Sequence, residues 1–259
     1  MNIPDSKLAV TLYNLRDYCQ TESDLDSTLD KLCEIGYKAV QVSCVPLAPE
    51  IIKKQLDKHN LYCCATHEGL AFIKDETSKL IDKMQTLECD FVALGAPPID
   101  YVKDKEKFAE LVDTFNEKGA QLLEAGIKLG YHNHHFEFMH MEPHKPVLEL
   151  FYEKTCSKCV FSELDVHWVQ RGGANPETWI RKLAGRIPVI HFKDFAMIEM
   201  NPVFCEIGEG NLEWDKILKA CRDTNVRWYS IEQDNPYPGR DIFESMKISF
   251  NNLKAMGVN

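Results

Sequence analysis

The chain has no long apolar run. Its uninterrupted hydrophobic stretches are only a few residues long, whereas a membrane-spanning helix needs roughly 20 apolar residues. The N-terminal segment MNIPDSKLAV also lacks the charged and apolar regions of a signal peptide. We therefore expect a cytoplasmic protein that is neither exported nor membrane-bound.

Positive charge is scarce as well. The chain carries 30 Lys and Arg residues against 40 Asp and Glu residues, which gives a formal net charge of −10. This balance works against long-range attraction to nucleic acid or to anionic lipid. We expect no nucleic-acid partner and no membrane surface as a partner, with a local basic patch as the open alternative.

Sequence signals of several other protein classes are missing. No G-x-G-x-x-G fingerprint follows the first predicted strand, no Walker-type loop is present, and no linker or low-complexity segment divides the chain. Gly208 and Gly210 give only a weak signal for a phosphate site. We expect residues 1–259 to form a single domain, with 44% hydrophobic residues to supply its core.

The cysteines are numerous but do not form a clear framework. With ten cysteines in 259 residues and no export signal, we expect reduced thiols. Cys156 and Cys159 have the spacing of a metal or redox pair, but no second pair lies nearby. We interpret this spacing as a weak signal of a metal or redox function.

Apolar periodicity predicts eight alternations of strand and helix. The predicted strands span residues 7–13, 37–43, 61–67, 90–94, 126–133, 160–165, 187–192 and 226–232, and the helices span 22–35, 49–60, 77–88, 104–125, 146–154, 175–184, 214–223 and 241–256. This number of units in a chain of this length matches a parallel (β/α)₈ TIM barrel. A doubly wound open sheet is the alternative.

Ionisable side chains gather where the predicted strands end, which is where active sites of this fold lie. Asp165, His191 and Glu232 each close an apolar strand, and a buried carboxylate is costly without a charge partner. Together with His132, they supply two carboxylates and two imidazoles, a set that suits Zn²⁺, Mn²⁺, Co²⁺ or Fe²⁺. We predict a divalent metal site at these four residues.

Segments at these strand ends resemble the sugar phosphate isomerase/epimerase family of the xylose isomerase-like TIM barrels, near its inosose dehydratase branch. The segments are 12–17, 130–134, 164–166, 191–194, 208–210 with Trp214, and 231–234. The resemblance implies one divalent ion, often Mn²⁺, Co²⁺ or Zn²⁺, bound by Glu, Asp, His and Glu at strands five to eight. His132 departs from this pattern, because it stands where the family has its first Glu. His134 is the alternative ligand, since residues two apart point to the same side of a strand.

The resemblance also implies a reaction class. The substrate would be a sugar, polyol or keto-sugar that chelates the metal ion, and the ion would stabilise an enediolate intermediate. Depending on how this intermediate reacts further, the enzyme would be an isomerase, an epimerase, or a dehydratase or lyase. His132 in place of a glutamate makes a simple two-glutamate epimerisation less expected. For the base we predict Glu232 first, then His134 and Glu137, with Lys193 stabilising an oxyanion or binding a hydroxyl.

Further strand-end residues are candidate substrate contacts. His67 and His167 are expected to touch the substrate, Trp168 could form an apolar wall, and Arg16 and Glu68 are weaker candidates. Two other hypotheses remain: an endonuclease IV-like DNA-repair hydrolase, and a non-catalytic sugar-binding barrel. The substrate, its phosphorylation and the oligomeric state stay open at this stage.

Overall fold

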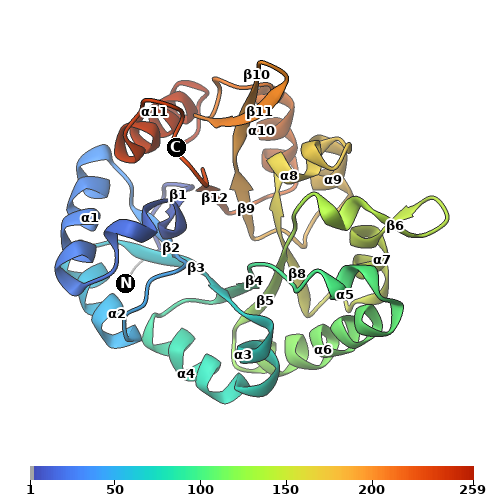
Figure 1. Cartoon of the computed structure of the whole chain (residues 1–259). Coiled ribbons are helices and arrows are strands. Elements are labelled where there is room, and N and C mark those ends of the chain that lie inside the picture. The colour runs from blue at the N-terminus through green and yellow to red at the C-terminus, as the bar shows by residue number, and fades with distance from the viewer. Residues whose placement is uncertain (1–2) are drawn as a thin grey trace.

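The computed structural model describes residues 3–259 and contains a closed barrel of eight parallel strands (Figure 1). In barrel order the strands are β1 (Leu8–Thr11), β2 (Ala39–Val42), β3 (Tyr62–Glu68), β4 (Phe91–Leu94), β5 (Lys128–His132), β8 (Val160–Asp165), β9 (Val189–Phe192) and β12 (Trp228–Ile231). Strand β12 pairs with β1 and closes the ring. The predicted (β/α)₈ fold is confirmed.

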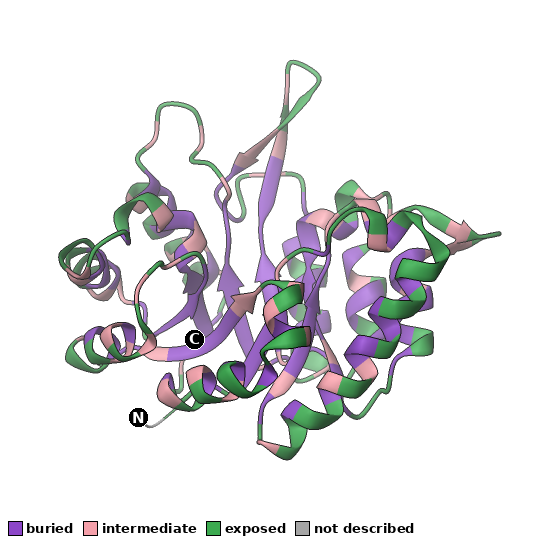
Figure 2. Cartoon of the chain, turned by 60° about the horizontal axis from the view of Figure 1, so that its bottom comes forward, coloured by how far each residue is buried: buried purple, intermediate pink, exposed green. Residues whose placement is uncertain are grey.

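Helices surround the barrel and connect its strands (Figure 1). The main helices are α1 (Glu22–Ile35), α2 (Pro49–Lys58), α4 (Thr77–Thr86), α6 (Lys105–Glu124), α7 (Val147–Lys154), α9 (Pro176–Lys182), α10 (Trp214–Asp223) and α11 (Ile242–Ala255). Figure 2 shows the barrel strands largely buried, while the helices are buried on one face only. Helix α1 illustrates the local signals, because Thr21 and Asp24 form a capping box at its start and Gly36, with φ of 119°, ends it.

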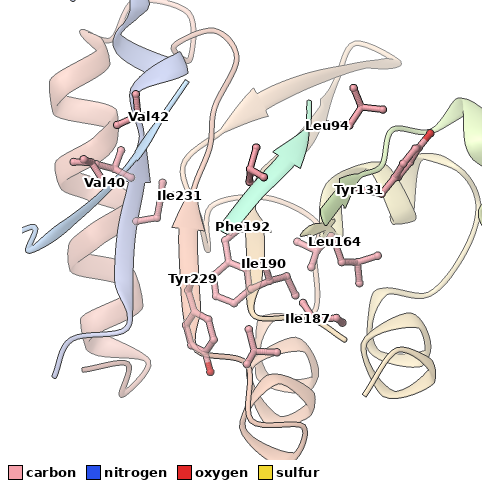
Figure 3. Packing of buried hydrophobic residues seen from close by; sticks show 14 of the residues in the cluster. Val40, Val42, Leu94, Tyr131, Leu164, Ile187, Ile190, Phe192, Tyr229 and Ile231 are labelled. Carbon is pink, nitrogen blue, oxygen red and sulfur yellow. The ribbon is translucent and has the colours of Figure 1, made fainter. Parts of the chain in front are cut away.

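The core has two parts because side chains alternate between the two faces of each strand. The larger cluster lies between strands and helices, and Figure 3 shows part of it, where the rings of Phe192 and Tyr229 are 4.8 Å apart. The smaller cluster includes Phe91, Val189 and Trp228. Gly130 is required beside it, since a Cβ at this position would collide with the Phe91 ring.

Short elements that the sequence did not predict lie in the connections. They are the 3₁₀ helices η1 (Leu12–Tyr18) and η2 (Phe136–Phe138), the helices α3 (Leu70–Asp75), α5 (Asp100–Lys103) and α8 (Val166–Arg171), and the strand pairs β6 (His140–Glu142) with β7 (Lys145–Pro146) and β10 (Asp194–Ile198) with β11 (Asn201–Cys205). The prediction that the first strand continues to residue 13 is wrong, because the chain turns into η1 after Thr11. The side chain of Thr11 accepts a hydrogen bond from the Tyr13 amide there.

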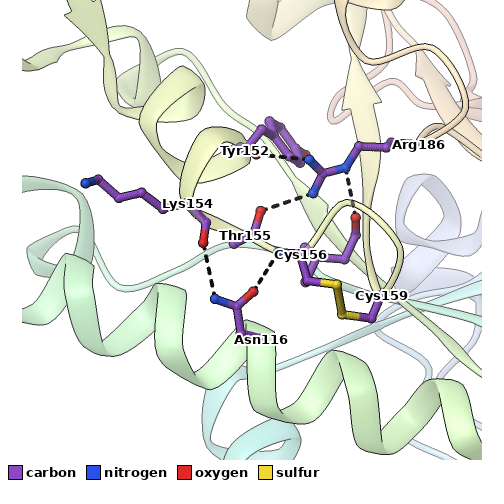
Figure 4. Close-up of a disulfide and its surroundings, with 8 residues drawn as sticks. Asn116, Tyr152, Lys154, Thr155, Cys156, Cys159 and Arg186 are labelled. Atoms are coloured by element: carbon purple, nitrogen blue, oxygen red, sulfur yellow. Dashed lines mark hydrogen bonds between the residues drawn. A yellow bond between two sulfur atoms is a disulfide. The ribbon is translucent and has the colours of Figure 1, made fainter.

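One pair of cysteines departs from the expectation of reduced thiols. Cys156 and Cys159 form a disulfide in the connection between α7 and β8 (Figure 4). The Asn116 side chain braces this connection, donating to the Lys154 carbonyl at 3.2 Å and accepting from the Cys156 amide at 2.7 Å. The other eight cysteines are unpaired. The connection precedes β8, so it lies at the opposite end of the barrel from the strand ends that carry the candidate site.

Across residues 3–259, no helix is both long enough and apolar enough to cross a membrane.

Candidate functional site

A cavity of about 340 Å³ lies at the C-terminal ends of the barrel strands. It is lined by Tyr13, Cys44, His67, Glu68, Gly69, Gly95, Ala96, His132, His134, Lys193, Glu232 and Asp234. The lining residues come from segments spread over the whole chain. Six of the residues singled out from the sequence are therefore gathered around one space.

The four predicted metal ligands converge beside this cavity. One donor atom from each of His132, Asp165, His191 and Glu232 lies within 4.8 Å of the others. His132 and Asp165 end β5 and β8, His191 lies in β9, and Glu232 follows β12. All four are buried, and His132 Nδ1 and Asp165 Oδ2 have no hydrogen-bond partner. Two imidazoles and two carboxylates with unsatisfied buried atoms fit a divalent transition-metal ion.

Lys193 brings a buried positive charge to the same cluster. Its Nζ atom lies 2.8 Å from Glu232 Oε2, 2.9 Å from Asp234 Oδ1 and 3.4 Å from Asp165 Oδ2. The residue is only 1% exposed, although it lines the cavity. Lys193 therefore neutralises carboxylates of the candidate metal centre and presents an ammonium group to whatever occupies the cavity.

The two imidazoles of the cluster have opposite protonation preferences. Burial lowers the pKa of His132 to about 4, and the nearby His191 adds to this effect. For His191, burial opposes the charged ring, but Glu163 and Glu232 outweigh it and raise the pKa to about 10. Its Nδ1 atom is 2.9 Å from Glu232 Oε2. Without a metal ion, His132 is therefore neutral and His191 protonated at neutral pH.

The two carboxylates also differ. Burial raises the pKa of Asp165 to about 7, despite the ammonium group of Lys193. Burial acts in the same direction on Glu232, but Lys193 and His191 reverse it and hold the pKa of that carboxyl well below its usual range. Glu232 is therefore ionised at neutral pH, as a carboxylate that accepts a proton must be.

Glu163 is a central residue of the site that sequence reasoning missed. It is fully buried in β8, two residues before Asp165. Its Oε2 atom contacts His67 Nε2 and lies 3.3 Å from His191 Nε2 and 3.4 Å from His132 Nδ1. The spacing could have revealed it, because residues two apart face the same side of a strand.

His134 and Glu137 follow β5 and have different surroundings. His134 lines the cavity, and burial together with His132 and Lys193 lowers its pKa, so its imidazole is neutral. Glu137 is buried outside the lining, where it accepts hydrogen bonds from the Tyr131 hydroxyl at 2.9 Å and the His134 amide at 2.8 Å. This position suits a residue that fixes the His134 segment. The neighbouring His135 is exposed.

The structure separates the predicted substrate contacts into two groups. His67 and Glu68 line the cavity, and Glu68 pairs with Lys83 at 2.6 Å. Arg16 lies behind Tyr13 and donates to the carbonyls of Tyr13 and Asp234.

His167 and Trp168 are outside the lining. His167 is fully buried, with its ring 5.0 Å from Phe195 and 5.1 Å from Phe204. The Trp168 ring lies 5.0 Å from Lys193 Nζ and 5.5 Å from the ring of His134. Trp168 therefore packs behind cavity residues, and neither side chain is among those that face the cavity.

The glycines that gave a weak phosphate signal serve another purpose. The amides of Gly208 and Gly210 donate to Asp194 Oδ2 at 3.0 and 3.2 Å, and the Trp214 indole donates to the same atom at 2.6 Å. Gly210 is required, because a Cβ there would collide with the Asp194 carboxylate. The backbone donors of this loop are thus satisfied by the chain's own carboxylate.

Comparisons with known proteins agree with this architecture. An inosose dehydratase from Clostridium perfringens is 21% identical over 253 residues, covering 82% of this chain and 84% of that protein. A sugar phosphate isomerase/epimerase structure from Parabacteroides distasonis superposes with a TM-score of 0.79 at 23% identity, covering 99% of this chain and 96% of that one. The structure of a probable 3-DHS dehydratase from Bacillus anthracis superposes with a TM-score of 0.72 at 14% identity, covering 96% of this chain and 98% of that one.

A family model described as the xylose isomerase-like TIM barrel matches residues 29–251. The match spans most of the barrel, including all four strands that supply the candidate ligands. The chain belongs to the xylose isomerase-like TIM barrel family.

Proposed function

We propose that this chain, working as a single barrel domain, is a divalent-metal-dependent isomerase, epimerase or dehydratase/lyase that acts on a sugar, polyol or keto-sugar. The observation that carries the proposal is the convergence of His132, Asp165, His191 and Glu232 within 4.8 Å beside the cavity. The names of the similar proteins, an inosose dehydratase and a sugar phosphate isomerase/epimerase, fall in the same reaction classes.

The proposed chemistry divides between a bound ion and the protein's own groups. The residues that would hold Mn²⁺, Co²⁺ or Zn²⁺ are the four named above, and such an ion supplies Lewis-acid polarisation of a carbonyl. Lys193 faces the same space and can donate hydrogen bonds to a substrate oxygen on which negative charge develops. Removal of the proton next to the carbonyl would then give an enediolate.

Glu232 is our first candidate for the base that removes this proton. It lines the cavity, and the low pKa that Lys193 and His191 give it keeps it ionised. His134 is the second candidate, because its neutral ring faces the cavity and its Nδ1 atom has no hydrogen-bond partner. Glu137 would act through His134 by holding its backbone.

The endonuclease hypothesis is less well supported. Three carboxylate residues, Glu68, Glu232 and Asp234, line the cavity, with Lys193 as the cationic residue among them. A nucleic acid carries a negative charge at every phosphate, which such a lining would repel. Cleavage of abasic DNA by the metal-loaded protein would reverse this preference.

Proton exchange tests the proposal whichever product the reaction forms. The protein, loaded with Mn²⁺ or Co²⁺, is incubated in D₂O with a panel of unphosphorylated keto-sugars and keto-inositols, and NMR follows deuterium entry next to the carbonyl. In the proposed enediolate mechanism, removal of the proton next to the carbonyl precedes isomerisation, epimerisation and β-elimination alike, so we expect exchange with at least one member.

Metal analysis and two variants complete the test. We expect about one divalent ion per chain after purification without chelator. His191→Ala and Glu232→Gln should each reduce the rate of deuterium exchange by at least about 10³-fold. The first variant removes a metal ligand, and the second removes a metal ligand that is also the candidate base. Full exchange activity in both variants would contradict the proposal.

A further inference from the structure

The carboxylate of Glu163 stands at the centre of three imidazoles. One oxygen, Oε2, faces His67 from β3, His132 from β5 and His191 from β9. In the part of the chain that the structure describes, these three rings are its ion-pair partners, and no Lys or Arg is among them. A fully buried carboxylate in such surroundings is too costly to be incidental.

The contacts fix which nitrogen of each ring faces Glu163. His132 does so with Nδ1 and His191 with Nε2, and Gln41 Oε1 lies 2.8 Å from the same His191 nitrogen. The other ring nitrogen of His191, Nδ1, lies 2.9 Å from Glu232, on the side of the candidate metal centre. The other nitrogen of His132, Nε2, is left available for a ligand.

We propose that Glu163 is the positioning residue of the metal centre: its carboxylate orients the rings of His132 and His191 so that their opposite nitrogens face the ion. A metal-binding histidine commonly gives its second nitrogen to a carboxylate, which fixes the ring and its tautomer. This inference rests on the proposed metal-dependent function and adds a residue to it. His67 shares the carboxylate and ties the cavity wall at β3 to the same network.

A direct ligand role for Glu163 is the competing assignment. His67, His132, Glu163 and His191 also bring donor atoms within 4.8 Å of one another. An ion there would have to displace the contacts that these rings make to Glu163 Oε2, among them the hydrogen bond of His67. An ion in the set with Asp165 and Glu232 would leave the contacts to Glu163 in place and would displace the one between His191 Nδ1 and Glu232 Oε2.

Metal affinity separates the alternatives. Binding of Mn²⁺ and Co²⁺ alone is measured by competition with a chelating dye for the wild-type chain, Glu163→Gln, Glu163→Asp and Asp165→Asn. Glu206→Gln is the matched control, because Glu206 is equally buried but pairs with Arg240 and Ser245 outside the cavity lining. The Co²⁺ absorption spectrum of each variant reports the ligand set.

We expect Glu163→Gln to weaken binding about 10- to 100-fold, the usual effect of losing a partner of a metal ligand, with the Co²⁺ spectrum retained at saturation. Glu163→Asp should recover part of the affinity, and Glu206→Gln should bind like the wild type. Unchanged affinity in Glu163→Gln would overturn the inference, and so would an equal loss in Glu206→Gln or a spectrum altered as in Asp165→Asn. A wild-type chain that binds no ion would instead refute the proposed function itself, and this inference with it.

Discussion

Glu137 shows how burial changes the chemistry of one residue. It is 1% exposed, and burial raises its pKa to about 7 even though the His134 amide and the Tyr131 hydroxyl donate to it. Since the pKa is higher in the folded chain than in the unfolded one, this group's stabilising contribution is complete below about pH 4.5 and is lost as pH rises through about 7.

Glu137→Gln should therefore flatten the pH dependence of stability. The shift from 4.5 to about 7 corresponds to roughly 3 kcal/mol. The free energy of unfolding is measured in urea at pH 5, 6, 7 and 8. Between pH 5 and pH 8 it should fall by about that much more for the wild-type chain than for the variant. Parallel curves for the two proteins would show that Glu137 does not carry this proton.

His191 gives a second prediction at the scale of one residue. Its pKa of about 10 means that a metal ion must displace a proton from the ring at neutral pH. We expect the affinity for Mn²⁺ to rise about tenfold per pH unit between pH 6 and 8, because one proton leaves for each ion bound. The slope should be steeper below pH 7, because Asp165 is protonated there and the bound ion must displace that proton as well.

Chelator competition at several pH values measures this slope, and His191→Gln provides the comparison. The variant should bind more weakly and with a flatter dependence on pH. A wild-type affinity independent of pH would mean that the ring of His191 is neutral before the ion binds.

At the scale of elements, strand β8 shows what periodicity can and cannot predict. Its bounds, 160–165, were predicted from its apolar pattern, and Asp165 was identified because it ends the strand. Glu163 belongs to the same inward-facing row, but a sequence does not say that three imidazoles from other strands will surround it. The extra helix α8 was missed because it begins directly where the strand ends, with the Asp165 side chain accepting from the Trp168 amide.

The loop after β11 gives a prediction at this scale. Asp194, at the start of β10, accepts from the amides of Gly208, Gly210 and Leu212 and from the Trp214 indole. Asp194→Ala would leave these donors without their acceptor, and we expect a loss of at least about 3 kcal/mol in the free energy of unfolding.

Asp241→Ala is the matched control for this experiment. Asp241 caps α11 by accepting from the Phe243 and Glu244 amides, but it is exposed, and loss of such a cap costs about 1 kcal/mol. Urea unfolding compares the two variants. A loss for Asp194→Ala no larger than that for Asp241→Ala would show that water replaces the carboxylate.

At the scale of the whole molecule, the candidate ligands connect β5, β8, β9 and β12, which span the second half of the chain. An ion that binds only the folded barrel stabilises it by mass action, about 2.7 kcal/mol at a free concentration 100 times Kd. We expect Mn²⁺ at that concentration to raise Tm by roughly 5–10 °C. Thermal unfolding with Mn²⁺ and with EDTA measures the difference.

His191→Ala should abolish this gain in Tm, whereas Glu206→Gln should keep it. A gain that persists in His191→Ala would place the ion elsewhere on the protein.

The amino-acid sequence by itself determined the barrel and indicated the candidate ligands at its strand ends, because strand and helix periodicity is local and the fold brings every strand end to one face. Through the family resemblance it also predicted that His132 stands where the family has its first glutamate. Only the tertiary structure decided how these groups combine. The three imidazoles around Glu163, the carboxylates around Lys193 and the donors around Asp194 come from segments far apart in the chain. Their contacts depend on how far each side chain extends across the barrel, and the order of residues along the sequence does not indicate this.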